Sequence, residues 1–225
     1  METHILWDID GTLIHNSRDG ATVYRDAFTR VTGAAPRRTI TNPHGMTEGQ
    51  LLAELLELNG HPSSMLDAVL AELDERTREQ HELGFAREAV AGGSQALHEV
   101  ANRGWRNGLL TGNGPLHSRY KLLAAGYSID DFDWNTSFFG DHSPDRHHLT
   151  ALVAPRLGAG TPIIIGDTPN DGLAADSANI PFIAVATGAY TVAELRNTSA
   201  LVVVEDLERG LADVLNTISE LTNRG

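Results

Sequence analysis

Apolar and polar positions along the chain follow two different periods. Short runs that are almost entirely apolar, such as "HILW" from His4 and "PIIIG" from Pro162, predict strands that are buried on both faces. From residue 89 onward such runs alternate with segments in which apolar residues recur every three or four positions, as in amphipathic helices. The later strands are expected in "WRNGLLTGN", "WNTSFFG", "TPIIIGD", "PFIAVAT" and "ALVVVED". This alternation predicts an α/β fold with a Rossmann-like parallel sheet.

One part of the chain lacks the strand pattern. The segments "RDGATVYRDAFTRVTG", "TEGQLLAELLELNG" and "SSMLDAVLAELDERTREQHEL" all have helical spacing, and "DRHHLTALVAPRLG" later in the chain is also expected to be one helix. Gly33 and Gly60 are plausible ends for the first two helices. We therefore predict that residues 17–86 form a helical domain inserted after the first strand. Residues 1–16 and 87–225 would form the α/β core.

Composition narrows the function. The 225 residues carry a formal net charge of −13 without any basic cluster, which disfavours partners such as nucleic acid or an anionic membrane. No apolar run approaches about 20 residues and the N-terminus has no signal-like core, so we expect a cytoplasmic protein. Because the chain has no cysteine, covalent chemistry would need an oxygen or nitrogen nucleophile.

The first predicted strand leads into "DIDGT". On an extended strand Asp8 and Asp10 project to the same side. Gly11 permits a tight turn, and Thr12 offers a hydroxyl where backbone N–H groups become free. Two neighbouring carboxylates repel each other, and a divalent cation is the simplest group that would relieve this. The alternative is an acidic turn that closes a strand.

Two other predicted strands also end in polar residues. Thr111, Gly112 and Asn113 follow one strand, and Asp167 and Asp171 follow another. Taken singly, the first group could form a turn, and the second could cap a helix. The carboxyl ends of parallel strands share one edge of the sheet, where ligands bind. We therefore expect these residues to meet Asp8 and Asp10 at one site.

The motifs "DIDGT", "LLTGN" and "GDTPND", in this order, resemble those of the haloacid dehalogenase-like (HAD) hydrolase superfamily. The helical insertion resembles the C1-type cap of phosphatases such as phosphoglycolate phosphatase. The resemblance implies a magnesium-dependent phosphatase that hydrolyses a small phosphate monoester through an aspartyl phosphate, with Asp8 as nucleophile and Asp10 as general acid and base. Mg²⁺ would be held by Asp8, the Asp10 backbone carbonyl, Asp167 and Asp171. The phosphate would meet Gly11, Thr12, Thr111, Gly112 and Asn113.

The superfamily usually has a lysine between its second and third motifs. Lys121, the one lysine of the chain, comes soon after Thr111, and we expect it to lie too early for that position. Arg146 precedes Asp167 at the appropriate distance, and its permanent charge and forked guanidinium suit a phosphate. We therefore predict that Arg146 takes this place. The alternative is a surface arginine beside Asp145.

Substrate choice is expected to reside in the insertion. The turn-rich "RRTITNPHGMTEG" is the predicted lip of the site, where Arg37, Arg38, His44, Thr47 and Glu48 could reach a second group of a small phosphorylated metabolite. The arginine pair would suit a carboxylate or another anion, or could simply be solvated surface arginines. Two further readings stay open at this point: a sugar phosphomutase of the same superfamily, and a non-catalytic protein that binds phosphoryl groups for regulation.

Overall fold

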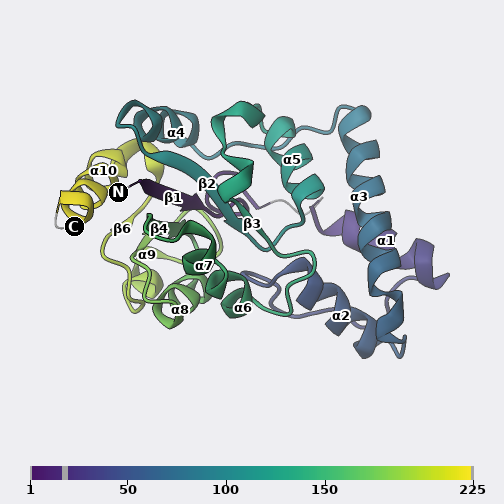
Figure 1. Ribbon diagram of the computed structural model, residues 1–225. Helices are drawn as coiled ribbons and strands as arrows, with labels where there is room; N and C mark the ends of the chain where they lie inside the picture. Colours follow the sequence, from purple (N-terminus) through teal and green to yellow (C-terminus); the bar gives the residue numbers. More distant parts are fainter. Residues whose placement is uncertain (1, 17–19, 224–225) are drawn as a thin grey trace.

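A parallel sheet forms the centre of the protein. The computed structural model describes residues 2–16 and 20–223, and within them one six-stranded sheet has the order β3-β2-β1-β4-β5-β6 (Figure 1). Every neighbouring pair of strands is parallel, so the predicted α/β fold class is confirmed. The strands are β1 (Thr3–Trp7), β2 (Arg106–Thr111), β3 (Phe138–Phe139), β4 (Thr161–Gly166), β5 (Phe182–Val185) and β6 (Val203–Val204).

Strand β1 lies in the middle of the sheet, where Trp7 is in register with Leu109 of β2 and Ile165 of β4. All five residues of β1 are buried. Trp7 belongs to the apolar cluster on one face of the sheet and Leu6 to the cluster on the other. Because both faces are covered, this strand has to be apolar at consecutive positions rather than at alternate ones.

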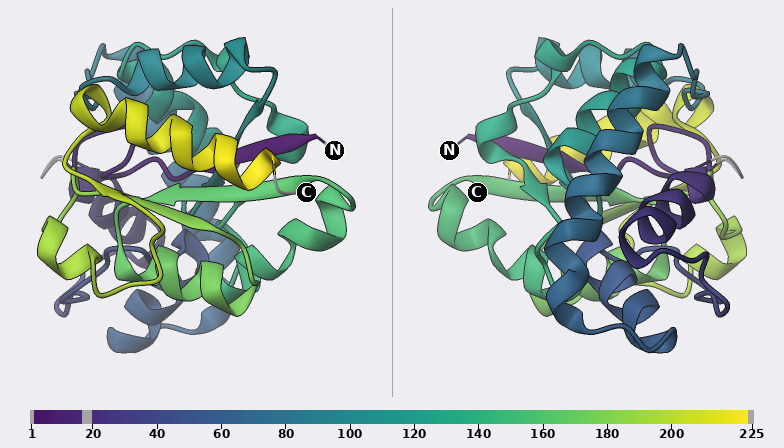
Figure 2. Two further views of the ribbon diagram at one scale, coloured as in Figure 1. Left: turned by 90° about the vertical axis from the view of Figure 1, so that its left-hand side faces the viewer. Right: turned by 90° about the vertical axis from the view of Figure 1, so that its right-hand side faces the viewer.

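Helices cover both faces of the sheet (Figure 2). The cluster on one face includes side chains of α4 (Gly93–Asn102), α5 (Pro115–Ala124) and α10 (Leu207–Asn223). The cluster on the other face includes side chains of α6 (Arg146–Ala151), α7 (Val153–Leu157), α8 (Pro169–Ser177) and α9 (Val192–Leu195). Among the described residues, none of the helices has the length and apolar character that a bilayer crossing requires.

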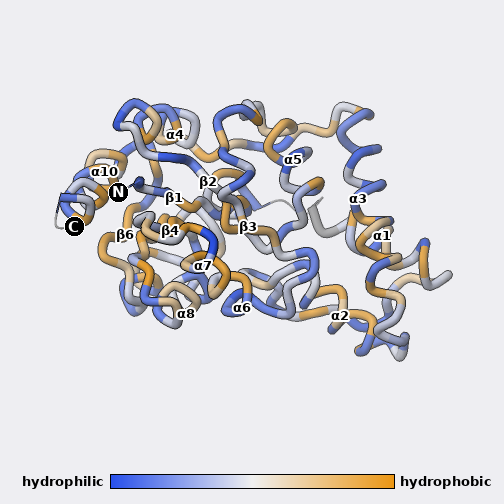
Figure 3. Tube along the Cα trace, in the orientation of Figure 1, coloured by the Kyte–Doolittle hydropathy of each residue, from blue (hydrophilic) through white to orange (hydrophobic). Residues whose placement is uncertain are grey.

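A helical insertion follows β1. It comprises α1 (Gly20–Thr32), α2 (Glu48–Leu58), the short 3₁₀ helix η1 (Ser63–Met65) and α3 (Leu66–Glu82). The buried residues of its apolar cluster come from α1, α2 and α3 and include Phe28, Leu52 and Leu73. Polar and apolar positions alternate along α3, whereas β4 is predominantly apolar (Figure 3). The predicted helical cap after the first strand is confirmed, while its limits of 17 and 86 stay a prediction because residue 17 lies outside the described part.

The structure departs from the predicted elements in three places. The strand expected at "WNTSFFG" is reduced to β3, because Asp133 accepts hydrogen bonds from the Asn135 N–H (3.0 Å) and the Ser137 hydroxyl (2.7 Å) and turns the chain into the 3₁₀ helix η3 (Trp134–Thr136). Another 3₁₀ helix, η2 (Ile129–Asp131), precedes it, and β6 is shorter than "ALVVVED" suggested. The single helix expected over "DRHHLTALVAPRLG" is divided into α6 and α7, since Pro155 has no N–H for the carbonyl of Ala151.

Candidate active site

The turn after β1 fixes the first two acidic side chains. The Asp8 N–H continues the sheet by donating to the Ile165 carbonyl (2.9 Å). The chain then folds back, so that the N–H groups of Leu13 and Ile14 both donate to the Ile9 carbonyl (2.9 Å each). Gly11 makes this possible with φ of +89°, a value that favours glycine. Ile9 is fully buried in the core, whereas Asp8 and Asp10 line the cavity of the site.

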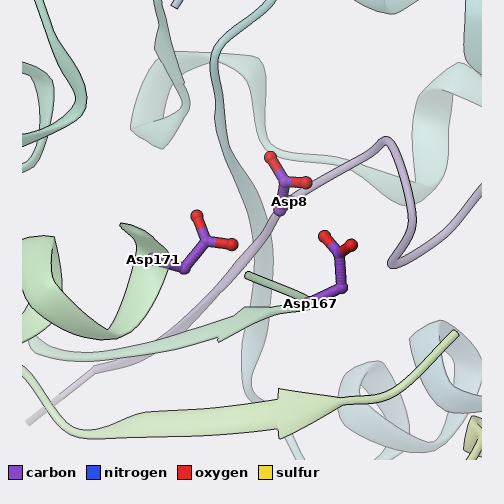
Figure 4. A group of neighbouring side chains, drawn as sticks. All are labelled: Asp8, Asp167 and Asp171. Carbon is purple, nitrogen blue, oxygen red and sulfur yellow. The ribbon is translucent and has the colours of Figure 1, made fainter. Parts of the chain in front are cut away.

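Three carboxylates meet at the carboxyl end of the sheet. Asp8, Asp167 and Asp171, which we call the acidic cluster, each have an oxygen within 4.8 Å of the others (Figure 4). Asp167 follows β4 directly, and Asp171 lies in the first turn of α8. Burial raises the pKa of Asp8 to about 7, in spite of the opposing charge of Arg146. Burial and then the charge of Asp8 raise the pKa of Asp167 well above its usual range.

The surroundings of Asp167 fit a bound cation. Its Oδ2 atom is buried and accepts no hydrogen bond from any described residue, whereas Oδ1 accepts a long one from the Thr12 hydroxyl (3.4 Å). A Cβ atom at Gly11 or at Gly188 would collide with this carboxylate, so both glycines leave it room. A buried, unpaired carboxylate oxygen beside two other carboxylates is the type of ligand set that Mg²⁺ binds.

The two carboxylate oxygens of Asp171 have different partners. Its Oδ2 accepts from the N–H (3.1 Å) and the hydroxyl (2.7 Å) of Thr168, which completes a capping box with Pro169 in the first turn of α8. The alternative of a helix cap therefore applies to Asp171. Its Oδ1 faces the acidic cluster and lies 2.6 Å from Nη2 of Arg146.

Arg146 pairs with two carboxylates of the acidic cluster. It is only 4% exposed, and its Nη2 lies 3.1 Å from Asp8 Oδ1 and donates to the Leu110 carbonyl (2.7 Å). The Asp145 side chain caps α6 by accepting from the His148 N–H (2.7 Å), which fixes Arg146 at the start of that helix. The alternative of a surface arginine is wrong, and the structure brings Arg146 to Asp8 as the sequence predicted.

Asp10 has different partners from those of Asp8. Lys121 Nζ lies 3.0 Å and 2.8 Å from its two carboxylate oxygens, and Asn113 Nδ2 donates to one of them (2.7 Å). Lys121 also donates to Asn113 Oδ1 (2.7 Å), and Thr111 accepts from Asn113 Nδ2 (2.8 Å). Burial alone would raise the pKa of Asp10, but the charge and hydrogen bonds of Lys121 lower it to about 2.

The N-terminus of α2 docks on the core close to these residues. The Glu48 N–H donates to the Gly112 carbonyl (2.7 Å), and the Thr47 hydroxyl donates to the Ser143 carbonyl (2.6 Å). The Glu48 carboxylate is buried and accepts from the Gly114 N–H (2.7 Å) and the Tyr24 hydroxyl (2.9 Å), and it contacts His117 Nδ1. A core helix and two helices of the insertion thus share one carboxylate.

These residues surround a cavity of about 580 Å³. Its base is formed by Asp8, Asp10, Thr111, Asn113 and Arg146, and its walls come mainly from the insertion. A buried carboxylate held between an arginine and further carboxylates can act as a nucleophile on an anionic substrate once positive charge is present.

A family model described as haloacid dehalogenase-like hydrolase matches residues 5–176, and a second, described as HAD-hydrolase-like, matches residues 144–209. The chain belongs to the haloacid dehalogenase-like hydrolase family. The family assignment agrees with the motifs at the three strand ends. None of the curated proteins compared with the chain matches it significantly.

Solved structures share the fold of this HAD chain. A hydrolase from Pseudomonas syringae is 19% identical, with a TM-score of 0.71, and the match covers 96% of this chain and 99% of that one. A predicted phosphatase from Clostridium acetobutylicum is 16% identical, with a TM-score of 0.70 and the same coverage. CbbY from Rhodobacter sphaeroides, in complex with phosphate, is 16% identical, with a TM-score of 0.67 over 93% of this chain and 96% of that one. At these identities the likeness shows the fold.

Some residues predicted for the HAD site lie elsewhere. Arg37 and Arg38 are exposed and are not part of the cavity lining, because their N–H groups donate to Asn59 Oδ1 (2.8 and 3.0 Å) and hold this segment against the end of α2. His44 does line the cavity. Thr47 is buried there, but its hydroxyl is bonded to Ser143 and caps α2.

Sequence reasoning missed the contacts of two residues of the HAD site. It gave Lys121 no role because that lysine comes too early for the position that Arg146 occupies, yet α5 starts directly after the Thr111 motif and brings Lys121, in its second turn, to Asp10. It treated Glu48 as a possible substrate ligand, whereas its carboxylate is bonded to Tyr24 and Gly114. The signal for Lys121 was its being the one lysine in the chain, and no local signal identified the partners of Glu48.

Proposed function

We propose that this HAD hydrolase is a magnesium-dependent phosphatase that cleaves a small phosphate monoester. The observation that carries the proposal is the position of the Asp8 carboxylate at the base of the cavity, in contact with Arg146 and close to the other members of the acidic cluster. Phosphoryl transfer requires a positioned nucleophile and neutralised phosphate oxygens; Asp8 would be the nucleophile, and Arg146 together with a metal held by the acidic cluster would neutralise the phosphate. The complex of the similar Rhodobacter sphaeroides CbbY with phosphate supports phosphate as the group bound.

In the first step an Asp8 oxygen bonds to phosphorus while the bond from phosphorus to the alcohol oxygen breaks, and Asp10 gives that oxygen a proton. In the second step a water oxygen bonds to phosphorus, the bond to Asp8 breaks, and Asp10 takes the proton of the water. Arg146 holds phosphate oxygens, together with Thr111 and the backbone around Gly112. Mg²⁺ held by Asp8, Asp167, the Asp10 carbonyl and, directly or through orientation, Asp171 would supply positive charge to the phosphate and the nucleophile.

The partners of Asp10 suit the second step, in which Asp10 accepts a proton, better than the first, in which it donates one. Lys121 and Asn113 hold its carboxylate in the charged form, which is ready to accept a proton from water. For the first step Asp10 must carry a proton, so we expect the arrival of the dianionic phosphate to compete for Lys121 and to weaken its ion pair with Asp10.

The test is phosphate release from a panel of small esters, with Mg²⁺ or with chelator, for the native protein and Asp8→Asn. We expect release that depends on the metal and falls at least about 10³-fold in the variant, because the nucleophile is lost. Asp176→Asn, which removes an exposed carboxylate of α8, serves as the matched control and should keep native activity. Release that persists in Asp8→Asn or with chelator contradicts the proposal, as does transfer of phosphate within a sugar phosphate without release.

A further inference from the structure

One part of the cavity lining is apolar, and we call it the apolar wall. The side chains that form it come from the insertion and from the turn after β1, and they are Ile14, Tyr24, Ile40, Met46, Leu51 and Leu55. Resting on the proposed function, we propose that the substrate is a phosphate monoester whose alcohol part is mainly apolar and carries no second charge.

This wall is fixed in place before any ligand arrives. Leu51 and Leu55 are four residues apart on α2 and so lie on the same face of that helix. Leu55 is 7% exposed and also belongs to the apolar cluster of the insertion, while Ile14 is 1% exposed in the core. The hydroxyl of Tyr24 is bonded to Glu48, which holds the aromatic ring. Apolar surface presented by a preformed wall favours an apolar ligand.

Each cationic side chain of the lining has at least one interaction within the protein, although the buried Nε of Arg146 has no acceptor among the described residues. Arg146 is paired with Asp8 and Asp171, and Lys121 is paired with Asp10. Of the other lining residues, Arg25 lies 3.5 Å from Asp26 in a pair whose side chains are both largely exposed, and Arg87 has an interaction within the protein. A second phosphate or a carboxylate on the substrate would have to replace one of these interactions and would lose its hydration against apolar side chains.

The carboxylate of Glu48 does not recruit a cationic substrate either, because it accepts from Gly114 and Tyr24 and contacts His117. His44 and Thr39 also line the cavity and can bond an uncharged hydroxyl or carbonyl. A cavity of about 580 Å³ is larger than a phosphate group alone requires and lies in the usual range for small-molecule sites. The geometry thus favours an alcohol that fills an apolar space.

The experiment uses a series of methyl, butyl, hexyl and octyl phosphates. Their alcohols are similar as leaving groups, so differences in kcat/KM report on the wall. We expect kcat/KM to rise with chain length, by up to about fourfold per methylene, until the cavity is filled. Phosphoglycolate and fructose 1,6-bisphosphate, which carry a second anion, should be at least about tenfold poorer than hexyl phosphate because that anion is desolvated.

A matched pair of variants on α2 tests whether the apolar wall causes the dependence of kcat/KM on chain length. Leu51→Asn alters the wall, whereas Leu58→Asn makes the same change at a residue that is 37% exposed and outside the lining. We expect Leu51→Asn to lower the ratio of kcat/KM for hexyl phosphate to that for methyl phosphate at least about fivefold, and Leu58→Asn to leave it unchanged. This ratio does not depend on the fraction of folded enzyme.

The outcomes separate the two proposals. No phosphate release from any ester would overturn the proposed function itself. Release that is independent of chain length, a preference for the ester with a second anion, or an equal ratio in Leu51→Asn and native enzyme would overturn the inference about the alcohol and leave the phosphatase intact.

Discussion

The acidic cluster and Asp10 hold charge in opposite ways. In the cluster, two of the three buried carboxylates, Asp8 and Asp171, pair with Arg146, and one oxygen of the third, Asp167, has no donor among the described residues. Asp10, two residues after Asp8, has a lysine and an amide of its own. The protein thus neutralises the Asp10 carboxylate with its own residues. The acidic cluster, in contrast, has more negative than positive charge. We therefore expect a cation to bind beside the acidic cluster and not beside Asp10.

The same contrast predicts opposite responses to pH. The pKa values of Asp8 and Asp167 are raised, so without metal the folded state binds more protons than the unfolded chain. For Asp8, stability is then lost as pH rises from its unfolded pKa of about 3.9 through about 7. The pKa of Asp10 is lowered to about 2, so its contribution is present above about pH 3.9 and is lost as pH falls through about 2.

The largest effect should follow from Asp167→Asn. It removes a charge from the crowded cluster, so we expect the metal-free variant to be more stable than native protein at pH 7.5, with a melting temperature higher by about 2–4 °C for a gain near 1 kcal/mol. The stabilisation by Mg²⁺ should be lost, and phosphatase activity should fall about 10³-fold. Thermal unfolding at pH 5 and 7.5, with Mg²⁺ or chelator, measures these changes.

Asp176→Asn again provides the control, since it removes an exposed charge from the same helix that carries Asp171. A native-like response to Mg²⁺ in Asp167→Asn would show that the acidic cluster is not the cation site. Equal gains in stability for the two variants would show that the effect is one of overall charge.

A smaller effect is expected for Lys121→Met, which leaves the Asp10 carboxylate without its cation. The Asp10 side chain is 38% exposed, so screening reduces the penalty, and we expect a loss of about 1–3 kcal/mol in the free energy of unfolding at pH 7.5. Activity should fall about 10- to 100-fold because proton transfer by Asp10 is impaired. Urea unfolding and steady-state kinetics measure the two effects.

Lys121→Arg is the conservative companion and should recover part of the stability. The stabilisation by Mg²⁺ should persist in Lys121→Met, because the proposed metal site is formed by the acidic cluster and does not include Lys121. If the response to Mg²⁺ disappears with Lys121, the acidic cluster and the Asp10 pair are not separate.

The smallest effect should come from Glu48→Gln, because Glu48 belongs neither to the acidic cluster nor to the direct partners of Asp10. The carboxylate accepts from Gly114 and Tyr24 and contacts His117, and an amide keeps only one acceptor oxygen. We expect a loss of about 1 kcal/mol, with faster hydrogen exchange at the start of α2 and an activity change of only a few-fold. Glu57→Gln, at an exposed position of α2, is the control, and equal exchange in both variants would argue against a role of Glu48 in docking.

The parts that the sequence could predict are those with a local signal. Consecutive apolar residues in β1 and β4 identified central strands, and the polar residues after Trp7, Thr111 and Gly166 marked the edge where they meet. Arg146 could be placed because its spacing from Asp167 is set by the short helices α6 and α7 and by strand β4.

The missed parts depend on contacts between distant segments. Arg37 and Arg38 looked suitable for an anion, but Asn59 binds their backbone from 22 and 21 residues away. Glu48 meets His117 across 69 residues of sequence. Such contacts depend on the folded arrangement of segments that are far apart in the sequence, including the packing of the insertion against the core. The pattern of residue types along the sequence does not determine that arrangement.

The docking of α2 has a consequence for protein engineering. Backbone bonds join Glu48 to Gly112 and Gly49 to Gly140 (2.7 and 3.0 Å), and a Cβ atom at Gly49 would lie 2.7 Å from the Asp141 carbonyl oxygen. Exchanging the insertion for that of another family member would leave the strand-end motifs unchanged. A chimera that lacks Glu48 and Gly49, however, would lose the backbone hydrogen bonds that hold the insertion on the core. A graft that retains Thr47, Glu48 and Gly49 offers the better junction for transferring a new specificity.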